Sequence, residues 1–97
     1  MRMYNPPHPG EFIREVYLEP FGVSTRSVAE KLKVSPSTFN RLINGESNVS
    51  PEMALRLSKT LGRSAESWLA MQDNYDLWRA RNQVDLEAVE KLEISVA

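Results

Sequence analysis

The stretch STRSVAEKLKVSPSTFNRLIN, residues 24–44, decides the fold of this 97-residue chain. Apolar residues in its first half recur with the spacing of one helix face: Val28, Ala29 and Leu32. Ser35 followed by Pro36 marks a new helix start, because serine caps well and the N–H that proline lacks is not needed in the first turn. The second half then carries its own inner face: Phe39, Leu42 and Ile43. The stretch therefore predicts two short helices joined by residues 33–35.

Two such helices form a helix-turn-helix when a small residue stands where they cross and apolar residues hold fixed offsets around it. Ala29 is the small residue, since a larger side chain there would push the helices apart. The apolar offsets are filled by Val28, Leu32, Val34, Phe39 and Leu42. Lys33 occupies the turn position where glycine is usual, and a positive φ there would strain it by roughly 1 kcal/mol. We predict a helix-turn-helix over residues 24–44.

Helix signals continue on both sides of this motif. A first helix starts at Pro9, ends at Pro20 and Gly22, and turns one face inward: Phe12, Ile13, Val16 and Tyr17. Ser50-Pro51 starts a fourth helix that Gly62 stops, with the stripe Met53, Ala54, Leu57 and Leu61. Ser64 caps a fifth that ends near Asn82 and carries Trp68, Leu69, Met71, Tyr75 and Trp78.

The last residues predict a short extension. Asp85 starts a sixth helical segment with three residues turned inward: Leu86, Val89 and Leu92. Residues 93–97 are either a frayed tail or a short strand. The sequence thus predicts an all-α, five-helix domain over residues 1–81 and a helical C-terminal extension over residues 82–97.

Composition excludes several classes of function. The chain has no cysteine and a single histidine, His8, which argues against disulfides and against zinc or other metal centres. No apolar run approaches the roughly 20 residues that span a bilayer, and the N-terminus lacks a signal peptide's apolar block, so we expect a cytoplasmic protein without membrane contact. We predict no catalytic, cofactor or metal site and no enzyme activity: His8 has a surface or capping role, and the isolated glycines form no phosphate loop. The serines before helices are caps: Ser24, Ser35, Ser50 and Ser64.

Charge is distributed unevenly although the net charge is only −1. Residues 24–63 hold seven basic and three acidic residues, a balance of +4, whereas residues 64–97 hold three basic and seven acidic residues, a balance of −4. Such a chain suits a protein that turns one end toward phosphates and the other toward a different partner. Chance variation on solvated faces is the alternative explanation.

The second helix of the motif carries the side chains suited to reading double-stranded DNA in the major groove. Its outward residues are the predicted base contacts, four of the five uncharged, unlike the Lys and Glu pairs of a merely solvated helix: Ser37, Thr38, Asn40, Arg41 and Asn44. Arginine pairs with guanine and asparagine with adenine through two hydrogen bonds. Phosphate contacts are predicted on both flanks of the groove: Thr25, Arg26, Lys33, Ser35, Ser47, Asn48 and Ser50. Three further basic residues are expected to be remote, solvated charges: Arg56, Lys59 and Arg63.

The fifth helix is rich in large apolar side chains. Trp68 is expected in the core, while three residues on the same face form a predicted dimer or partner interface: Met71, Tyr75 and Trp78. Dimeric readers hold two recognition helices about one DNA turn apart, so the region after Ser64 is predicted to form a homodimer.

In the order and spacing of its motifs, the chain resembles the lambda-repressor-like, XRE-family helix-turn-helix proteins, and within them the HigA antitoxins, also called VapI-like. The matching stretches extend from His8 to Arg81 and are HPGE (8–11), LEPFGVS (18–24), VSPS (34–37), LING (42–45), MALRL (53–57) and SWLAMQDNYDLW (67–78). The chain departs from the wider family at Thr25 and Arg26, where glutamine is common, and at Lys33. These departures affect particular phosphate contacts and leave the lambda-repressor-like fold expected.

The resemblance implies an antitoxin that neutralises a partner HigB-like toxin, a ribonuclease acting on translated messenger RNA. It also implies a homodimer that represses its own operon by binding a palindromic operator. A toxin that binds RNA is usually basic, so the acidic end of the chain would complement it. A stand-alone XRE-type repressor without a toxin is the first alternative. A protein-binding module that keeps only the helix-turn-helix shape is the second.

Overall fold

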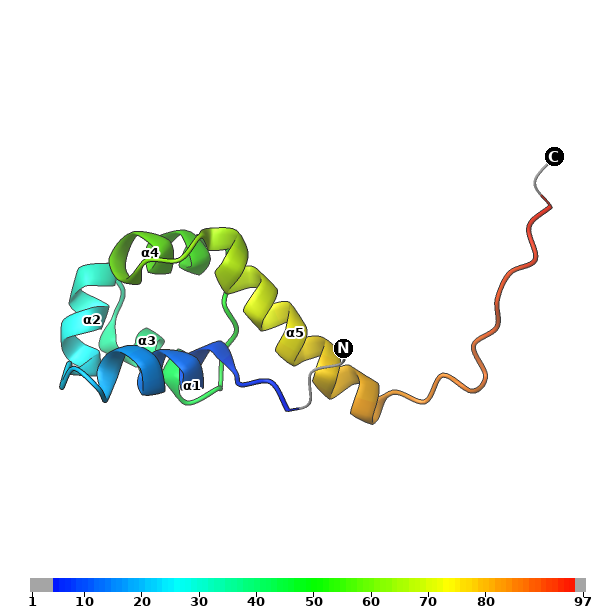
Figure 1. Cartoon of the computed structure of the whole chain (residues 1–97), viewed down its shortest axis with the longest axis horizontal. Helices are drawn as coiled ribbons and strands as arrows, with labels where there is room; N and C mark the ends of the chain where they lie inside the picture. The colour runs from blue at the N-terminus through cyan, green and yellow to red at the C-terminus, as the bar shows by residue number, and fades with distance from the viewer. Residues whose placement is uncertain (1–4, 96–97) are drawn as a thin grey trace.

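The computed structural model describes residues 5–95, which form six helical segments and an irregular C-terminal segment (Figure 1). In chain order these are α1 (Pro9–Ile13), the π-helical turn η1 (Arg14–Leu18), α2 (Thr25–Leu32), α3 (Pro36–Ile43), α4 (Pro51–Leu61) and α5 (Ala65–Gln83). Since η1 continues α1 directly, these segments are the five helices predicted. No strand occurs in the described range, so the all-α prediction is confirmed.

Serine caps set where four helices begin. Each serine Oγ accepts a hydrogen bond of 3.0–3.1 Å from the backbone N–H three residues later, and the four are Ser24, Ser35, Ser50 and Ser64. A cap of this kind stabilises a helix by about 1 kcal/mol. His8 caps α1 in the same manner, with Nδ1 accepting from the Gly10 N–H at 2.9 Å. The predicted caps, including that of His8, are therefore confirmed, although His8 is buried and not on the surface.

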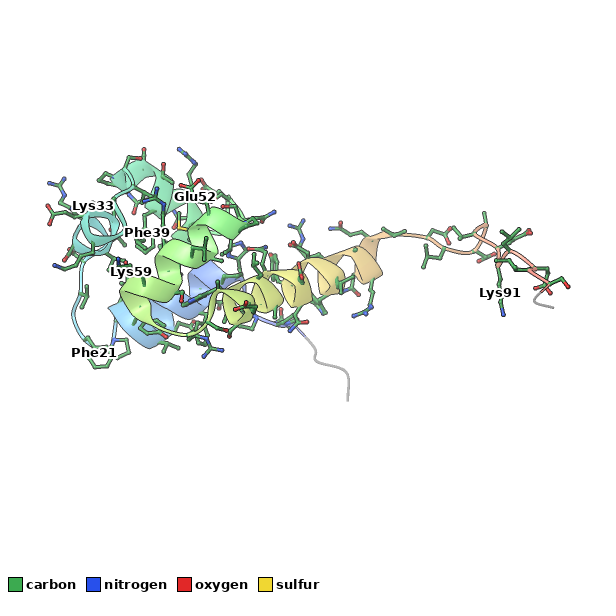
Figure 2. The ribbon with its side chains drawn as sticks, turned by 90° about the horizontal axis from the view of Figure 1, so that it is seen from above. Phe21, Lys33, Phe39, Glu52, Lys59 and Lys91 are labelled. Atoms are coloured by element: carbon green, nitrogen blue, oxygen red, sulfur yellow. The ribbon has the colours of Figure 1, made fainter. Side chains whose placement is uncertain are left out.

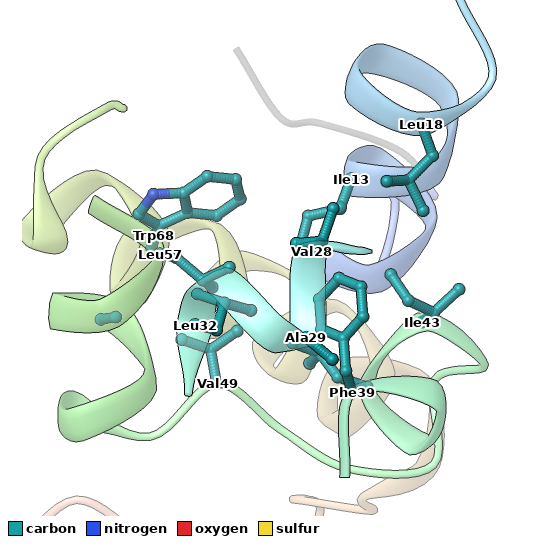
Figure 3. Close-up of a cluster of buried hydrophobic side chains, with 12 residues drawn as sticks. Ile13, Leu18, Val28, Ala29, Leu32, Phe39, Ile43, Val49, Leu57 and Trp68 are labelled. Atoms are coloured by element: carbon teal, nitrogen blue, oxygen red, sulfur yellow. The ribbon is translucent and has the colours of Figure 1, made fainter. Parts of the chain in front are cut away.

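The core lies where α2 and α3 cross, and α1, α4 and α5 close it (Figure 3). Ala29 is fully buried at this crossing and the ring of Phe39 lies beside it, as the predicted packing requires. Trp68 brings α5 into the same cluster and donates from Nε1 to the Gly62 carbonyl at 2.9 Å. The other fully or nearly buried apolar side chains are Ile13, Leu18, Val28, Leu32, Leu42, Ile43, Val49, Ala54 and Leu57.

The expected inner face of the first helix is wrong at one residue. Val16 is 41% exposed, because the helix widens at η1, where the Glu19 N–H bonds to the Arg14 carbonyl five residues back at 2.9 Å. A π-helical turn holds more residues than an α-helical turn, so every later side chain is rotated about the axis. Leu18 takes the buried position as a result.

The prediction of a sixth helical segment is also wrong, because the extension is not helical. The chain leaves helical conformation at Val84, and residues 84–95 form no helix or strand. Leu86, Val89 and Leu92 are 65–75% exposed, because α5 carries the chain away from the body and leaves nothing to pack against (Figure 1). A helix this short does not form in water without such packing. Val96 and Ala97 of the predicted tail or strand lie outside the described residues, as do residues 1–4.

The molecule is elongated, 57 × 27 × 26 Å, with α5 and the extension projecting from one end (Figure 1). Residues 84–95, which hold four acidic residues and one basic residue, thus lie away from the basic helices of the body. None of the helices described has the length and apolar character that crossing a membrane requires.

Candidate nucleic-acid interface

The outward face of α3 presents the polar side chains predicted to contact bases. Ser37, Asn40, Arg41 and Asn44 are exposed, the last of them as the residue that ends the helix. Thr38 is half-buried, and its Oγ1 accepts a hydrogen bond of 2.8 Å from the Ser35 hydroxyl. The structure therefore brings four of the five side chains to one open face and engages the fifth at the helix cap.

Both ends of α3 are held in place. Ser35 caps the start, and Arg14 in η1 donates from Nη2 to the Ile43 carbonyl at 2.7 Å, across a sequence separation of 29 residues. Phe39, Leu42 and Ile43 are buried beneath the open face, as predicted. A recognition helix fixed at its base and at both ends keeps its outward side chains in a constant geometry. Nothing in the sequence pattern marked Arg14 for this role, because its acceptor is a distant backbone carbonyl.

The first predicted phosphate-contacting flank is split between two places. Arg26, at the start of α2, lines a shallow depression together with Val34 and Pro36, so it lies beside the start of α3. Thr25 is half-buried in the first turn of α2. Lys33 lines a different depression with Lys59 on the α4 side of the molecule. The structure therefore places Arg26, and not Lys33, next to the recognition helix.

Lys33 adopts the left-handed conformation expected for the turn, with φ 62° and ψ 41°. The following Val34 N–H bonds back to the Ala29 carbonyl at 3.1 Å, the six-residue closure that commonly ends a helix. This turn directs the chain from α2 into α3. Lys33 therefore has the strained positive φ that was predicted for this position, and its side chain is exposed.

The second flank is the loop between α3 and α4. Asn48 and Ser50 are exposed and Ser47 is half-buried, so all three predicted residues lie in one short segment before α4. The Ser50 hydroxyl is also the α4 cap. Sequence reasoning missed Gln72 of α5, which is 3% exposed and accepts from the Val49 N–H at 2.8 Å. No signal in the sequence marked this role, because the Val49 N–H that Gln72 accepts from is 23 residues away in the chain.

Two basic residues expected to be remote, solvated charges make contacts within the chain. Arg56 in α4 donates from Nη1 to the Leu32 carbonyl at 2.8 Å, which fastens α4 to the end of α2. Its guanidinium also pairs at 2.9 Å with Glu52 on the same helix, labelled in Figure 2. The Arg63 guanidinium lies over the rings of Phe12 and Trp68, at 5.1 and 5.9 Å from their centroids. The expectation of a solvated charge is therefore wrong for Arg56, because the Leu32 carbonyl is available to it only in the folded chain. Arg63 is exposed, as expected, although its guanidinium lies over two rings.

The predicted interface residues of α5 are each half-buried within the single chain. The Tyr75 ring meets the His8 ring edge-on at 5.0 Å, and Trp78 lies 6.3 Å from Tyr75 toward the projecting end. Met71 lines a cavity of about 290 Å³ with Pro6 and Phe12. His8 thus covers part of the Tyr75 side chain, while Trp78 lies on the part of α5 that leaves the body. The burial of His8 in this contact lowers its pKa below the ordinary value of 6.5.

Together, the tight α2–α3 crossing and the open polar face of α3 define a helix-turn-helix protein. The family model described as Helix-turn-helix matches residues 13–68. The chain is 38% identical to an uncharacterised HTH-type transcriptional regulator, YddM of Escherichia coli K12, over 95% of this chain and 97% of that protein. It is 38% identical to antitoxin HigA-1 of Vibrio cholerae, over 81% of this chain and 74% of that one.

Solved structures agree with these relatives. The fold matches that of antitoxin GraA with a TM-score of 0.85 and 38% identity, covering 93% of this chain and 99% of that one. GraA in complex with its operator matches with a TM-score of 0.82 and 35% identity, covering 100% and 98% of the two chains. The chain belongs to the lambda-repressor-like, XRE-family helix-turn-helix proteins, in the group that contains the HigA antitoxins, as its motifs had indicated.

Proposed function

We propose that this protein is the antitoxin of a type II toxin–antitoxin pair that binds operator DNA and represses its own operon. One observation carries the DNA-binding part: α3 turns an exposed, mostly uncharged polar face to solvent while its base and both ends are fixed. A major groove is wide enough to admit such a helix. We assign base contacts to Arg41, suited to guanine, and Asn40, suited to adenine, with smaller contributions from Ser37, Thr38 and Asn44.

Phosphate contacts are proposed on either side of this helix. Arg26 is the best supported on the first flank because it lies beside the start of α3. The loop before α4 supplies the second flank, where the free N–H groups of the helix start favour an anion. The remaining members of the proposed set are Thr25, Lys33, Ser35, Ser47, Asn48 and Ser50, among which the Ser35 and Ser50 hydroxyls already cap helices.

We propose that the protein acts as a homodimer, because a palindromic operator needs two recognition helices about one DNA turn apart. The proposed contact is the face of α5 that carries Met71, Tyr75 and Trp78, of which Trp78 lies on the part that leaves the body. In this scheme residues 1–81 are the DNA-binding domain and residues 82–97 are free for a partner. The toxin would be a HigB-like ribonuclease, and the −4 balance of residues 64–97 would complement a basic, RNA-binding surface.

This role assigns the chain no catalytic residue and places it in the cytoplasm, where operator DNA lies. The relatives named as antitoxins, and the GraA complex with its operator, support the assignment. A stand-alone repressor without a toxin is the second candidate, supported by the relative described only as a transcriptional regulator. Co-expression with the product of the neighbouring reading frame separates the two, since only an antitoxin forms a stoichiometric complex and restores growth.

Operator binding is tested by the Arg41→Ala variant. We expect it to lose about 1–3 kcal/mol of binding free energy toward the protein's own upstream DNA, with selectivity relaxed at one base-pair position. Lys91→Ala is the matched control, because it also removes one positive charge but lies in the extension far from α3 (Figure 2). Titration by fluorescence anisotropy measures both. Equal affinities for Arg41→Ala and the unmodified protein would refute base readout by α3.

A further inference from the structure

Gln72 is a buried amide whose hydrogen bonds link α5 to the loop before α4. Its Oε1 accepts from the Val49 N–H at 2.8 Å. Its Nε2 donates to the Asn48 Oδ1 at 3.2 Å and to the Asp76 Oδ1 at 3.0 Å. Only 3% of Gln72 is exposed, so these partners and not water determine how its amide is oriented.

The Val49 N–H determines which atom donates and which accepts in every hydrogen bond of this network. A backbone N–H can only donate, so the Gln72 atom that faces Val49 must be the carbonyl oxygen. The two Nε2 hydrogens then point toward Asn48 and Asp76, and both neighbours must offer acceptors. Asp76 meets this demand with a carboxylate, whereas Asn48 meets it only by turning its Oδ1 inward.

We propose that Gln72 is a positioning residue that orients the Asn48 amide so that its Nδ2 hydrogens point away from the body and donate to an operator phosphate. Asn48 is exposed, and with Oδ1 turned toward Gln72 the opposite side of its amide is the donor side. A phosphate accepts hydrogen bonds and repels carbonyl oxygens, so only this orientation is productive. The role rests on the proposed operator binding, and it assigns to a buried residue of α5 the orientation of a DNA-contacting side chain.

This role differs from simple support of the loop. An acceptor for the Val49 N–H would be enough to hold the loop, and glutamate at position 72 would supply one with nearly the same shape. Glutamate would, however, face the Asp76 carboxylate and share a proton with it, so the change is made in an Asp76→Asn background. An ionised glutamate there has no hydrogen to donate, so Asn48 would reverse its amide and present Oδ1 to the phosphate. Gln72→Glu therefore keeps the supporting bond and inverts the positioning one.

The experiment is a double-mutant cycle on operator affinity in the Asp76→Asn background, with Asn48→Ala, Gln72→Glu and the double variant. Asn74→Asp is the control for charge, since it adds one negative charge to an exposed position of α5. We expect Asn48→Ala to weaken binding about tenfold, the effect of losing a hydrogen bond to a charged group, without changing the salt dependence, because a neutral donor releases no counterion. Gln72→Glu should weaken binding at least as much when Asn48 is present. It should weaken binding no more than Asn74→Asp does when Asn48 is already alanine.

Equal effects of Gln72→Glu with and without Asn48 would overturn the positioning role, as would an Asn48→Ala variant that binds like the unmodified protein. Circular dichroism shows whether each variant folds. Should Gln72→Glu not fold, Asn48→Asp decides the matter: an acceptor that replaces the outward donor must weaken binding more than alanine does, and an equal or smaller loss refutes the role. If the unmodified protein binds no operator, the proposed function itself fails. If it binds the operator but Gln72 and Asn48 are uncoupled, only the positioning role fails.

Discussion

Replacing Gly10 by alanine tests how closely α1 approaches the recognition helix. Gly10 is buried in α1, and a Cβ atom there would overlap the Leu42 carbonyl and lie 2.9 Å from the Ile43 Cα. These atoms are backbone of α3, so no side-chain rotation can relieve the contact. The two helices would have to separate, and the change would be felt at the end of α3 that carries the proposed base contacts.

The expected loss of stability combines three effects. Alanine favours a helix over glycine by about 0.5–1 kcal/mol, which works in favour of the variant. Forcing a methyl group into a packed contact costs about 1–3 kcal/mol. Separation of the helices also lengthens the 2.7 Å bond from Arg14 to the Ile43 carbonyl, a charged hydrogen bond that contributes about 1.5–3 kcal/mol. The net effect is a destabilisation of about 3 kcal/mol, or a melting temperature lower by roughly 15 °C.

Urea denaturation and thermal melting, both followed by circular dichroism, measure this loss. Gly22→Ala is the matched control: Gly22 has φ +62° and a Cβ atom there would meet no other atom within 4 Å, so alanine introduces backbone strain alone, about 1 kcal/mol. A Gly10→Ala variant as stable as the unmodified protein would show that α1 does not approach α3 this closely.

Three further variants probe the cap, the crossing and the dimer. Burial lowers the pKa of His8, and only its neutral ring can accept from Gly10, so the unfolded chain binds more protons and stability should fall as pH drops from 7.5 through 6.5 toward the folded pKa. His8→Asn caps the helix without titrating, so its urea midpoint should depend less on pH over that range. An unchanged pH dependence in His8→Asn would contradict the cap. Ala29→Leu should lose about 1–3 kcal/mol in urea denaturation and weaken operator binding, and wild-type values for both would refute the tight crossing. Trp78→Ala should raise the dimer dissociation constant by about 30-fold in sedimentation equilibrium, and no change would move the dimer contact elsewhere.

Local signals in the sequence were enough to place the helices of the body. Serine before a helical run, and proline after Ser35 and Ser50, mark helix starts that the structure confirms, because a cap and the N–H it satisfies lie within three residues. The outward face of α3 followed from its buried face by helical geometry alone. Val16 was misplaced since a π-helical turn changes that geometry without a recognised sequence signal.

The sequence by itself determined the all-α architecture, the helix-turn-helix over residues 24–44 and the side chains that α3 exposes, since each depends on spacing along one or two neighbouring helices. Only the tertiary structure decided that Arg14 and Arg56 fasten helix ends, that Gln72 hydrogen-bonds to a loop 23 and 24 residues away, and that residues 84–95 form no helix. The physical reason is that such contacts depend on which backbone and amide groups meet across the fold, and on whether a surface is present for apolar residues to cover.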